Sequence, residues 1–576
     1  MAQDEGYLIL TSTQIKDGTA ECAATCTTDA DCGEDRCIDA FLDGAGQPAT
    51  RICGQRRFGH VDLTAYRRCD ASLCSSSQAC LRSPPLQELE RFAEHKRNRG
   101  FSVHVFTEDA WGGGVGDVAA ENLRTWLMTI APSTSAKYVL LIGDPSPTSG
   151  PLPMKQTWPE HNAQQTWATP NAVVPTDYYY ADLHGDWDLD QDGFVGEWGS
   201  VNLPEDQRGD FGPGGIDRIY DLKVGRIPWY QASDSAAVDH ILVKTMTYQN
   251  AEPEMIAWRR SALIATEGEN RFFFGEAIRS DLLEPNGYGS HRVYDADCIA
   301  REAAGGRPCM SPIDGQPEAL ECNPQNVLSG WNGLQPGMVF WLTHGSGQGA
   351  VSVMNSALTT MLDDTRPTFT FQASCYNSQP ELRNNVSYAL LKNGSINTIG
   401  ATRISHGPGS PVSLPNTAGN AGMAYEYARR MIVEEQNSGT ALMELKQNLP
   451  LQNRWWYWKN LCDFNIYGDP EVGLQDVRVE PPAVPDAGVA MEPDALVLPD
   501  AAAVVDAGVV MDAAAAPVRP DAQAMTSPDA QPGPAPQGED DRCSCRTTTT
   551  SGGRPLSALL LIGLVGALRA RRRPTL

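Results

Sequence analysis

The sequence predicts an α/β protein with two adjacent subdomains, each built on a mainly parallel sheet. Short apolar runs alternate with longer stretches in which apolar residues recur every three or four positions, and these patterns are typical of strands and helices respectively. Successive runs are separated by enough chain for right-handed crossovers, so neighbouring strands are expected to be parallel.

The first unit begins with a buried strand at residues 7–12 (YLILTS). After an interruption, apolar residues at Leu86, Leu89 and Phe92 have helical spacing, and Gly100 follows as a stop signal. Strand, helix and strand then alternate. The expected elements are helices at 86–98 and 117–130 and strands at 101–106 (FSVHVF) and 138–143 (YVLLIG).

A second unit of the same kind begins near Asp221 and ends near Leu474. Its apolar runs are again short and bounded by turn residues, as in buried strands. The expected elements are helices at 234–249, 276–283 and 382–392 and strands at 261–266 (SALIAT), 338–343 (MVFWLT), 368–373 (TFTFQA) and 396–400 (INTIG).

Cysteines mark a separate segment within the first unit, directly after its first strand. Eight of the 15 cysteines lie between Cys22 and Cys80. The block lacks zinc-ribbon C-x-x-C pairs and has only His60, so we favour disulfides over zinc. An insertion and a free-standing binding module both fit this block. The expected divisions are 1–20 (first strand), 21–83 (cysteine-rich insertion), 84–220 (rest of the N-terminal subdomain), 221–479 (second subdomain), 480–541 (linker) and 542–576 (C-terminal segment).

The last hundred residues have the composition of a linker followed by an anchor. Residues 480–541 repeat P-D-A and D-A-G units and contain no aromatic residue, which is typical of a disordered spacer. Cys543 and Cys545 follow, then an apolar stretch at 556–568 and an arginine cluster. This stretch is shorter than the roughly 17–25 residues of a bilayer span, so we expect a sorting or anchoring device that uses the membrane.

Net charge and cysteine content indicate which kinds of partner and which cellular compartment to expect. The net charge of −26 argues against nucleic acid as a partner. The polar start of the chain shows no secretory leader, whereas the dense cysteines indicate an oxidising compartment. We give more weight to the cysteines and expect an exported protein whose leader is not present in this chain.

Two strand ends carry residues suited to nucleophilic catalysis. MVFWLT is followed by His344-Gly345, and TFTFQA is followed by Ser374-Cys375, 31 residues later. If the strands are adjacent and parallel, both side chains emerge at one sheet edge, where an imidazole can activate a thiol and protonate a leaving amine. The Gly345 amide can face an oxyanion. A core cysteine and an ordinary polar histidine are the alternatives.

These motifs resemble the gingipain-type cysteine peptidases of the caspase–haemoglobinase class. The resemblance covers most of residues 1–475 and implies a caspase-like three-layer α/β/α fold. It also implies hydrolysis of protein or peptide substrates through an acyl-enzyme. Further motifs that carry it are YLILTS at 7–12, YVLLIGD at 138–144, VPTDYYYADLHGDWDLDQDGFVGE at 174–197, VGRIP at 224–228 and YGDPEVGL at 467–474.

The resemblance also implies roles for individual residues. Cys375 matches the nucleophile and His344 the general base and acid, with the backbone of Gly345 and Cys375 at the oxyanion. A third acidic residue after SALIAT is Glu267, with Glu269 or none as alternatives. His406 is a rival base. By position, the substrate pocket is expected to include Asn377, Ser378, Thr402 and His406.

Cysteine parity is consistent with a free thiol at Cys375. Eight cysteines in the insertion can pair among themselves. Apart from Cys375, an even number of cysteines then remains in the expected folded region. That set is Cys298, Cys309, Cys322 and Cys462.

An acidic segment, DWDLDQDGFVGE, predicts a calcium site. Alternate carboxylates with a glycine turn suit a hard ion that takes six to eight oxygens. The segment departs from the EF-hand because position twelve from Asp188 is Gly199. A solvated acidic turn is the alternative. The expected ligands of a structural calcium are Asp186, Asp188, Asp190, Asp192 and Glu197.

The tail resembles the myxobacterial C-terminal sorting signal of the MYXO-CTERM type. This resemblance implies export, processing near Cys543 or Cys545 by sorting machinery, and attachment to the cell surface or outer membrane, with release possible. The first functional hypothesis is therefore an exported, surface-anchored cysteine endopeptidase. The second is a catalytically inactive relative used for adhesion or display.

Overall fold

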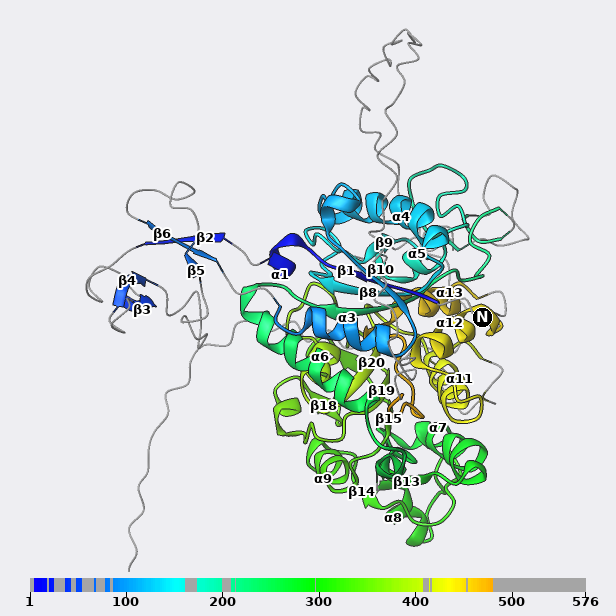
Figure 1. Cartoon of the computed structure of the whole chain (residues 1–576). Coiled ribbons are helices and arrows are strands. Elements are labelled where there is room, and N and C mark those ends of the chain that lie inside the picture. Colours follow the sequence, from blue (N-terminus) through cyan, green and yellow to red (C-terminus); the bar gives the residue numbers. More distant parts are fainter. Residues whose placement is uncertain are drawn as a thin grey trace, which may run out of the picture.

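One continuous sheet crosses the two expected subdomains in the computed structural model (Figure 1). The structure describes residues 5–17, 20–24, 37–42, 48–53, 67–68, 78–82, 86–160, 173–198, 209–212, 214–295, 297–407, 414, 417–451 and 454–479, with backbone alone between 20 and 82. In spatial order the eleven strands are β7 (Ser102–Phe106), β1 (Gly6–Leu10), β8 (Ala136–Gly143), β11 (Lys223–Pro228), β21 (Phe464–Gly468), β20 (Ser395–Ala401), β19 (Thr368–Ala373), β15 (Met338–Leu342), β12 (Ser261–Thr266), β13 (Gly289–Tyr294) and β14 (Ala319–Leu320).

The sheet consists of two parallel halves that run in opposite directions. Strands pair in parallel on both sides of one antiparallel step, between β20 and β21. The carboxyl ends of β12, β15, β19 and β20 therefore share one edge, and those of β1, β8 and β11 lie at the other. This arrangement confirms the α/β prediction and places the predicted catalytic residues at a single edge.

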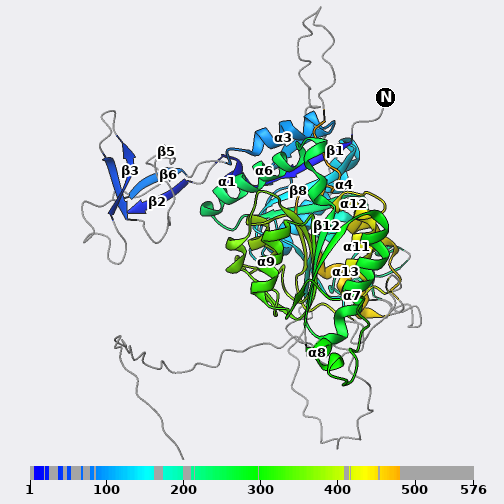
Figure 2. The ribbon, with the colours of Figure 1, turned by 90° about the horizontal axis from the view of Figure 1, so that it is seen from below.

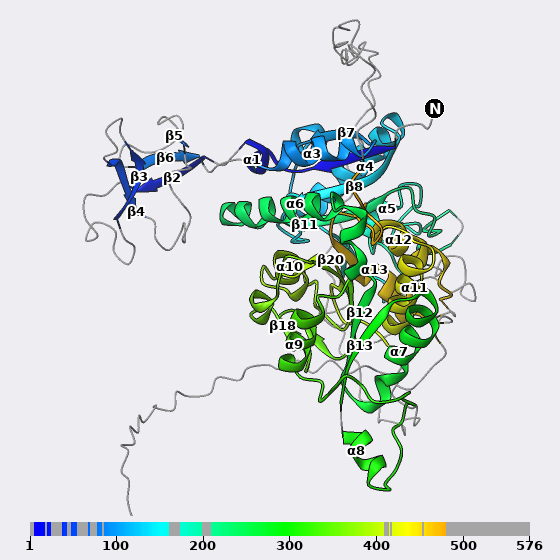
Figure 3. The same ribbon diagram turned by 60° about the horizontal axis from the view of Figure 1, so that its bottom comes forward.

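Helices cover both faces of the sheet, as Figure 3 shows. In β1, Tyr7 and Ile9 pack in one core while Leu8 and Leu10 pack in the other, because successive strand side chains point to opposite faces. One layer contains α3 (Leu89–Asn98), α6 (Ser235–Gln249), α10 (Val386–Lys392) and α9 (Pro324–Leu334). The other contains α4 (Gly116–Ser133), α7 (Phe272–Ala277), α11 (Asn420–Ile432), α12 (Ser438–Asn448) and α13 (Trp455–Asp463).

The expected insertion forms small sheets outside the main one (Figure 2). β2 (Ala20–Ala24) and β5 (Arg67–Arg68) pair with β6 (Gln78–Arg82), and β3 (Cys37–Leu42) pairs with β4 (Pro48–Cys53). The backbone register places Cys22 opposite Cys80 and Cys37 opposite Cys53. Disulfide bonding in this segment stays a prediction, because the structure describes only its backbone.

Most predicted elements lie within a few residues of the observed ones. The helix expected at 276–283 is instead α7 followed by a π-helical turn at Ile278–Leu283. Sequence reasoning did not assign β11, β13, β14 or β21 as strands. Among the described residues, no helix combines the length and apolar character needed to span a bilayer. The predicted linker and C-terminal segment lie outside the described residues.

Candidate active site

His344 and Cys375 follow the ends of two adjacent strands. β15 and β19 pair in parallel with Leu342 opposite Ala373, and the Thr343 amide donates to the Ala373 carbonyl at 3.3 Å. His344 and Cys375 each lie two residues beyond this last pair, at the same edge of the sheet. A Cβ added to Gly345 would lie 2.5 Å from the Cys375 carbonyl oxygen, so the two strand ends are in direct contact.

A tight turn holds Cys375 at the end of β19. Tyr376, the next residue, has a left-handed backbone (φ +61°) and donates its amide to the Arg403 carbonyl at 2.8 Å. The Ser374 hydroxyl accepts from Trp341 Nε1 at 3.0 Å and is also hydrogen-bonded to Asn377. The sulfur of Cys375 is buried and lies 3.7 Å from the backbone oxygen of Ser405. The position of Cys375 is therefore fixed by contacts of its neighbours on both sides.

The cysteine pattern corrects the parity prediction. Cys298 and Cys309 form a disulfide, but Cys322 and Cys462 are both free and buried, so the four do not pair completely. The sulfur of Cys375 is in a disulfide in this structure, and its partner is not among the other described cysteines. The free thiol expected at Cys375 is therefore absent from this form, and a nucleophilic role requires reduction.

An arginine connects Glu267 to His344. Glu267 follows β12, and its amide approaches the Leu342 carbonyl at 3.4 Å. Arg271 donates through one terminal nitrogen to the Glu267 carbonyl at 2.6 Å and forms an ion pair with its carboxylate. Its other terminal nitrogen lies 2.8 Å from His344 Nε2. Burial, and then the charge of Arg271, lower the pKa of His344, while Glu267 acts in the opposite direction.

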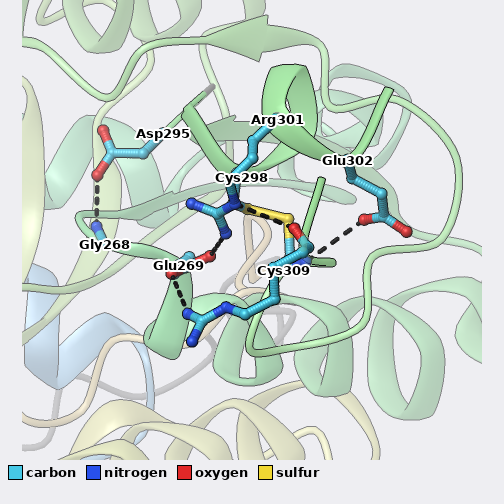
Figure 4. Close-up of a disulfide and its surroundings, with 8 residues drawn as sticks. Gly268, Glu269, Asp295, Cys298, Arg301, Glu302 and Cys309 are labelled. Atoms are coloured by element: carbon cyan, nitrogen blue, oxygen red, sulfur yellow. Dashed lines mark hydrogen bonds and ion pairs between the residues drawn. A yellow bond between two sulfur atoms is a disulfide. The ribbon is translucent and has the colours of Figure 1, made fainter. Parts of the chain in front are cut away.

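Glu269 has a different role from Glu267. Its carboxylate pairs with Arg301 at 2.5 Å and with Arg307 at 3.1 Å, beside the Cys298–Cys309 disulfide (Figure 4). These contacts secure the segment that contains the disulfide. Of the two acidic residues expected near the dyad, only Glu267 is linked to His344 by the contacts described above.

Of the four predicted pocket residues, three are buried and hydrogen-bonded within the fold, and the fourth packs against an aromatic ring. Asn377, Ser378 and Thr402 are fully buried. Asn377 donates to the Ser346 carbonyl at 2.8 Å, Ser378 bonds the Ser387 hydroxyl at 2.6 Å, and Thr402 donates to the Pro175 carbonyl at 2.8 Å. These side chains thus brace the site. His406 is half-buried, and its ring meets Trp455 edge-on, with centroids 5.4 Å apart.

The acidic segment brings three predicted calcium ligands together. Carboxylate oxygens of Asp188, Asp190 and Asp192 lie within 4.8 Å of one another. Oδ1 of Asp190 is buried and has no hydrogen-bond partner in the described part of the chain. Asp186 is exposed and accepts from the Asp188 amide at 3.1 Å, so it caps the turn. The clustered oxygens fit a hard cation.

Two buried carboxyls lie beneath this turn. Burial, and then the charge of Asp192, raise the pKa of Glu197 to about 9. Asp210, which sequence reasoning missed, accepts from the amides of Leu189, Gly196 and Glu197 at 2.6, 2.7 and 3.0 Å. Burial raises the pKa of Asp210 to about 7 even though these amides lower it. No local motif connects Asp210 to the turn, because it comes 13 residues after Glu197.

Comparisons with known proteins identify one family. A family model described as peptidase family C25 matches residues 75–475, more than half of the chain. The crystal structure of the Arg-specific cysteine proteinase gingipain R (RGPB) is 16% identical, with a TM-score of 0.47, over 68% of this chain and 76% of that chain. A complex of the pro- and mature domains of RgpB from Porphyromonas gingivalis is also 16% identical, with a TM-score of 0.45, over 67% and 76%. Among curated proteins, none matches.

Proposed function

Because the chain belongs to peptidase family C25, we propose that it cleaves peptide bonds through a Cys375–His344 dyad. The expected family is thereby confirmed, and the chain is a cysteine peptidase that acts on proteins or peptides. The observation that supports the dyad is the parallel pairing of β15 with β19, because each of the two residues follows the last paired position of its strand by two residues. Glu267 is proposed as the acidic third residue, acting through Arg271.

The proposed reaction begins with the reduced thiol. His344 takes the proton of Cys375, and the thiolate attacks the substrate carbonyl. Backbone N–H groups of Gly345 and Cys375 stabilise the oxyanion. His344 then protonates the leaving amine, which produces an acyl-enzyme and releases the first product. Water activated by His344 hydrolyses the thioester and restores the thiol.

A labelling experiment tests this proposal. The full chain, with calcium present, is treated with a peptide-based thiol-directed probe with and without a reductant, and Cys375→Ala is the control. We expect labelling at Cys375 and cleavage of a diverse peptide library only after reduction, and neither in the variant. If the reduced chain shows neither reaction, the endopeptidase proposal is wrong and the inactive relative is favoured.

We further propose that the peptidase is exported and held at the cell surface. The Cys298–Cys309 disulfide supports an oxidising compartment. The C-terminal cysteine motif, apolar stretch and arginine cluster support processing near Cys543 or Cys545 and membrane attachment. In intact producing cells, external protease should remove the folded region. Protection from protease until lysis would contradict surface exposure.

Calcium is the proposed structural ion of the acidic turn. Asp188, Asp190 and Asp192 would hold it, and their oxygens are the ligands that calcium prefers. The ion would neutralise mutual repulsion among these carboxylates and fix the turn. Its removal is expected to lower stability rather than change the chemistry at Cys375.

A further inference from the structure

Arg271 contacts Nε2 of His344, the nitrogen that an acidic partner would otherwise contact. It ends the short helix η9 (Glu269–Arg271), directly after β12, and its side chain is 11% exposed. Its guanidinium bonds Glu267 through Nη1 and approaches His344 Nε2 through Nη2 at 2.8 Å. One cation thus lies between the carboxylate and the imidazole.

The chemistry of a guanidinium restricts the proton on His344. Arginine carries only N–H donors and remains charged. His344 Nε2 must therefore accept from Arg271, and a nitrogen that accepts has no proton. The imidazolium carries a proton on both nitrogens, so it is incompatible with this contact.

We propose that Arg271 is a positioning residue that keeps His344 neutral at rest and leaves Nε2 when His344 takes the proton of Cys375. Nε2 is the nitrogen that takes this proton, because Nδ1 already carries one while Nε2 accepts from Arg271. The proton count balances, because Cys375 loses the proton that His344 gains and later gives to the leaving amine. This inference rests on the dyad proposed above and adds a step that precedes attack.

The groups around His344 make Arg271 the dominant positive charge. Arg271 contacts His344 from η9, Glu267 pairs with Arg271 from the end of β12, and Cys375 follows the adjacent strand β19. The hairpin of β16 (Gly345–Ser346) and β17 (Gly349–Ala350) adds no ionisable side chain. The direction of the His344 pKa agrees, since Arg271 lowers it and Glu267 raises it.

The test is the pH dependence of kcat/KM in Arg271→Met. Because His344 acts as a neutral base in this proposal, the ascending limb reports loss of the His344 proton as pH rises. Removing the cation favours the imidazolium, so we expect this limb to move up by about one pH unit. Arg271→Lys retains a charge and should move it less. Arg301→Met is the matched control, because it removes an arginine paired with Glu269 nearby.

A second readout does not depend on activity. In a Cys375→Ala background, the imidazole proton resonance of His344 is assigned by its loss in His344→Gln and followed through a pH titration. Adding Arg271→Met should raise its midpoint by about one unit, and Arg301→Met should leave it unchanged. An unmoved midpoint in a folded Arg271→Met chain would overturn the inference. An inactive wild-type chain with a shifted midpoint would overturn only the proposed peptidase dyad.

Discussion

Gly345 allows the two strand ends that carry His344 and Cys375 to touch. Its position has no room for a side chain, because an added Cβ would lie 2.5 Å from the Cys375 carbonyl oxygen and 2.9 Å from its nitrogen. Both neighbouring atoms are backbone, so they cannot move aside without shifting the nucleophile. The glycine therefore sets the geometry of the proposed dyad.

Gly345→Ala should reduce activity strongly while leaving the chain folded. We expect kcat/KM on a peptide substrate to fall about 100-fold, because small displacements of reacting groups cost that much. Chemical denaturation should show a loss of about 1–3 kcal/mol from overpacking. Gly349→Ala is the matched control, since it lies in the same hairpin and its nearest atom, the Met354 oxygen, is 3.6 Å from the added Cβ. Equal activity in the two variants would contradict this account.

At the scale of elements, apolar runs predict strand positions well, while side-chain partners depend on how the following turn folds. Apolar residues dominate MVFWLT and recur at every second position of TFTFQA, so β15 and β19 and the residues after them follow directly from sequence. Arg271 gives only a weak signal, a basic residue four positions after Glu267. Its contact with His344 arises because η9 turns back over the strand ends.

Strands without a long apolar run are harder to predict. β13 contains His291 and Arg292, and Arg292 is neutralised by Glu276 and Glu318 from other elements. β21 (FNIYG) buries Asn465, whose oxygen accepts from the Asp177 amide at 3.0 Å. Such polar residues enter a buried strand because distant partners satisfy them. Those partners are not apparent from local sequence.

We expect the acidic turn to make stability depend on both pH and calcium. Burial raises the pKa of Glu197 to about 9 and that of Asp210 to about 7, above their values in an unfolded chain. Carboxyls with raised folded pKa values bind protons more tightly when folded. Without calcium, the free energy of unfolding should therefore fall as pH rises from about 4.5 to about 9. A bound cation compensates the charge that appears over this range.

Thermal unfolding at pH 5 and pH 8, with calcium or with a chelator, measures this effect. We expect calcium to stabilise the chain mainly at pH 8, by about 2.7 kcal/mol at 100 times its Kd. Asp190→Asn should remove most of the gain. The exposed Asp217, which caps a turn by accepting from the Ile219 amide at 2.7 Å, supplies the control Asp217→Asn. A calcium effect that is absent at pH 8 would contradict the site.

Across the whole molecule, buried charges attach the end of the folded region to its beginning. Lys96 of α3 is fully buried and pairs with Asp469 at 2.5 Å and Glu471 at 2.6 Å, just after β21. Tyr7 of β1 donates to the same Asp469 at 2.7 Å. Residues far apart in sequence thus close the junction between the two halves of the sheet, a few residues before the predicted linker begins.

Lys96→Met tests how much this junction contributes. Removing one partner of a buried ion pair leaves the others uncompensated, so the free energy of unfolding should fall by about 3–5 kcal/mol in chemical denaturation. Arg97→Met is the matched control, because the neighbouring Arg97 pairs with Glu90 and Glu94 at the surface, where such pairs contribute about 0–1 kcal/mol. If the two variants lose the same stability, the buried cluster does not hold the halves together. A large loss for Lys96→Met alone would show that the active-site half depends on residues from the start of the chain.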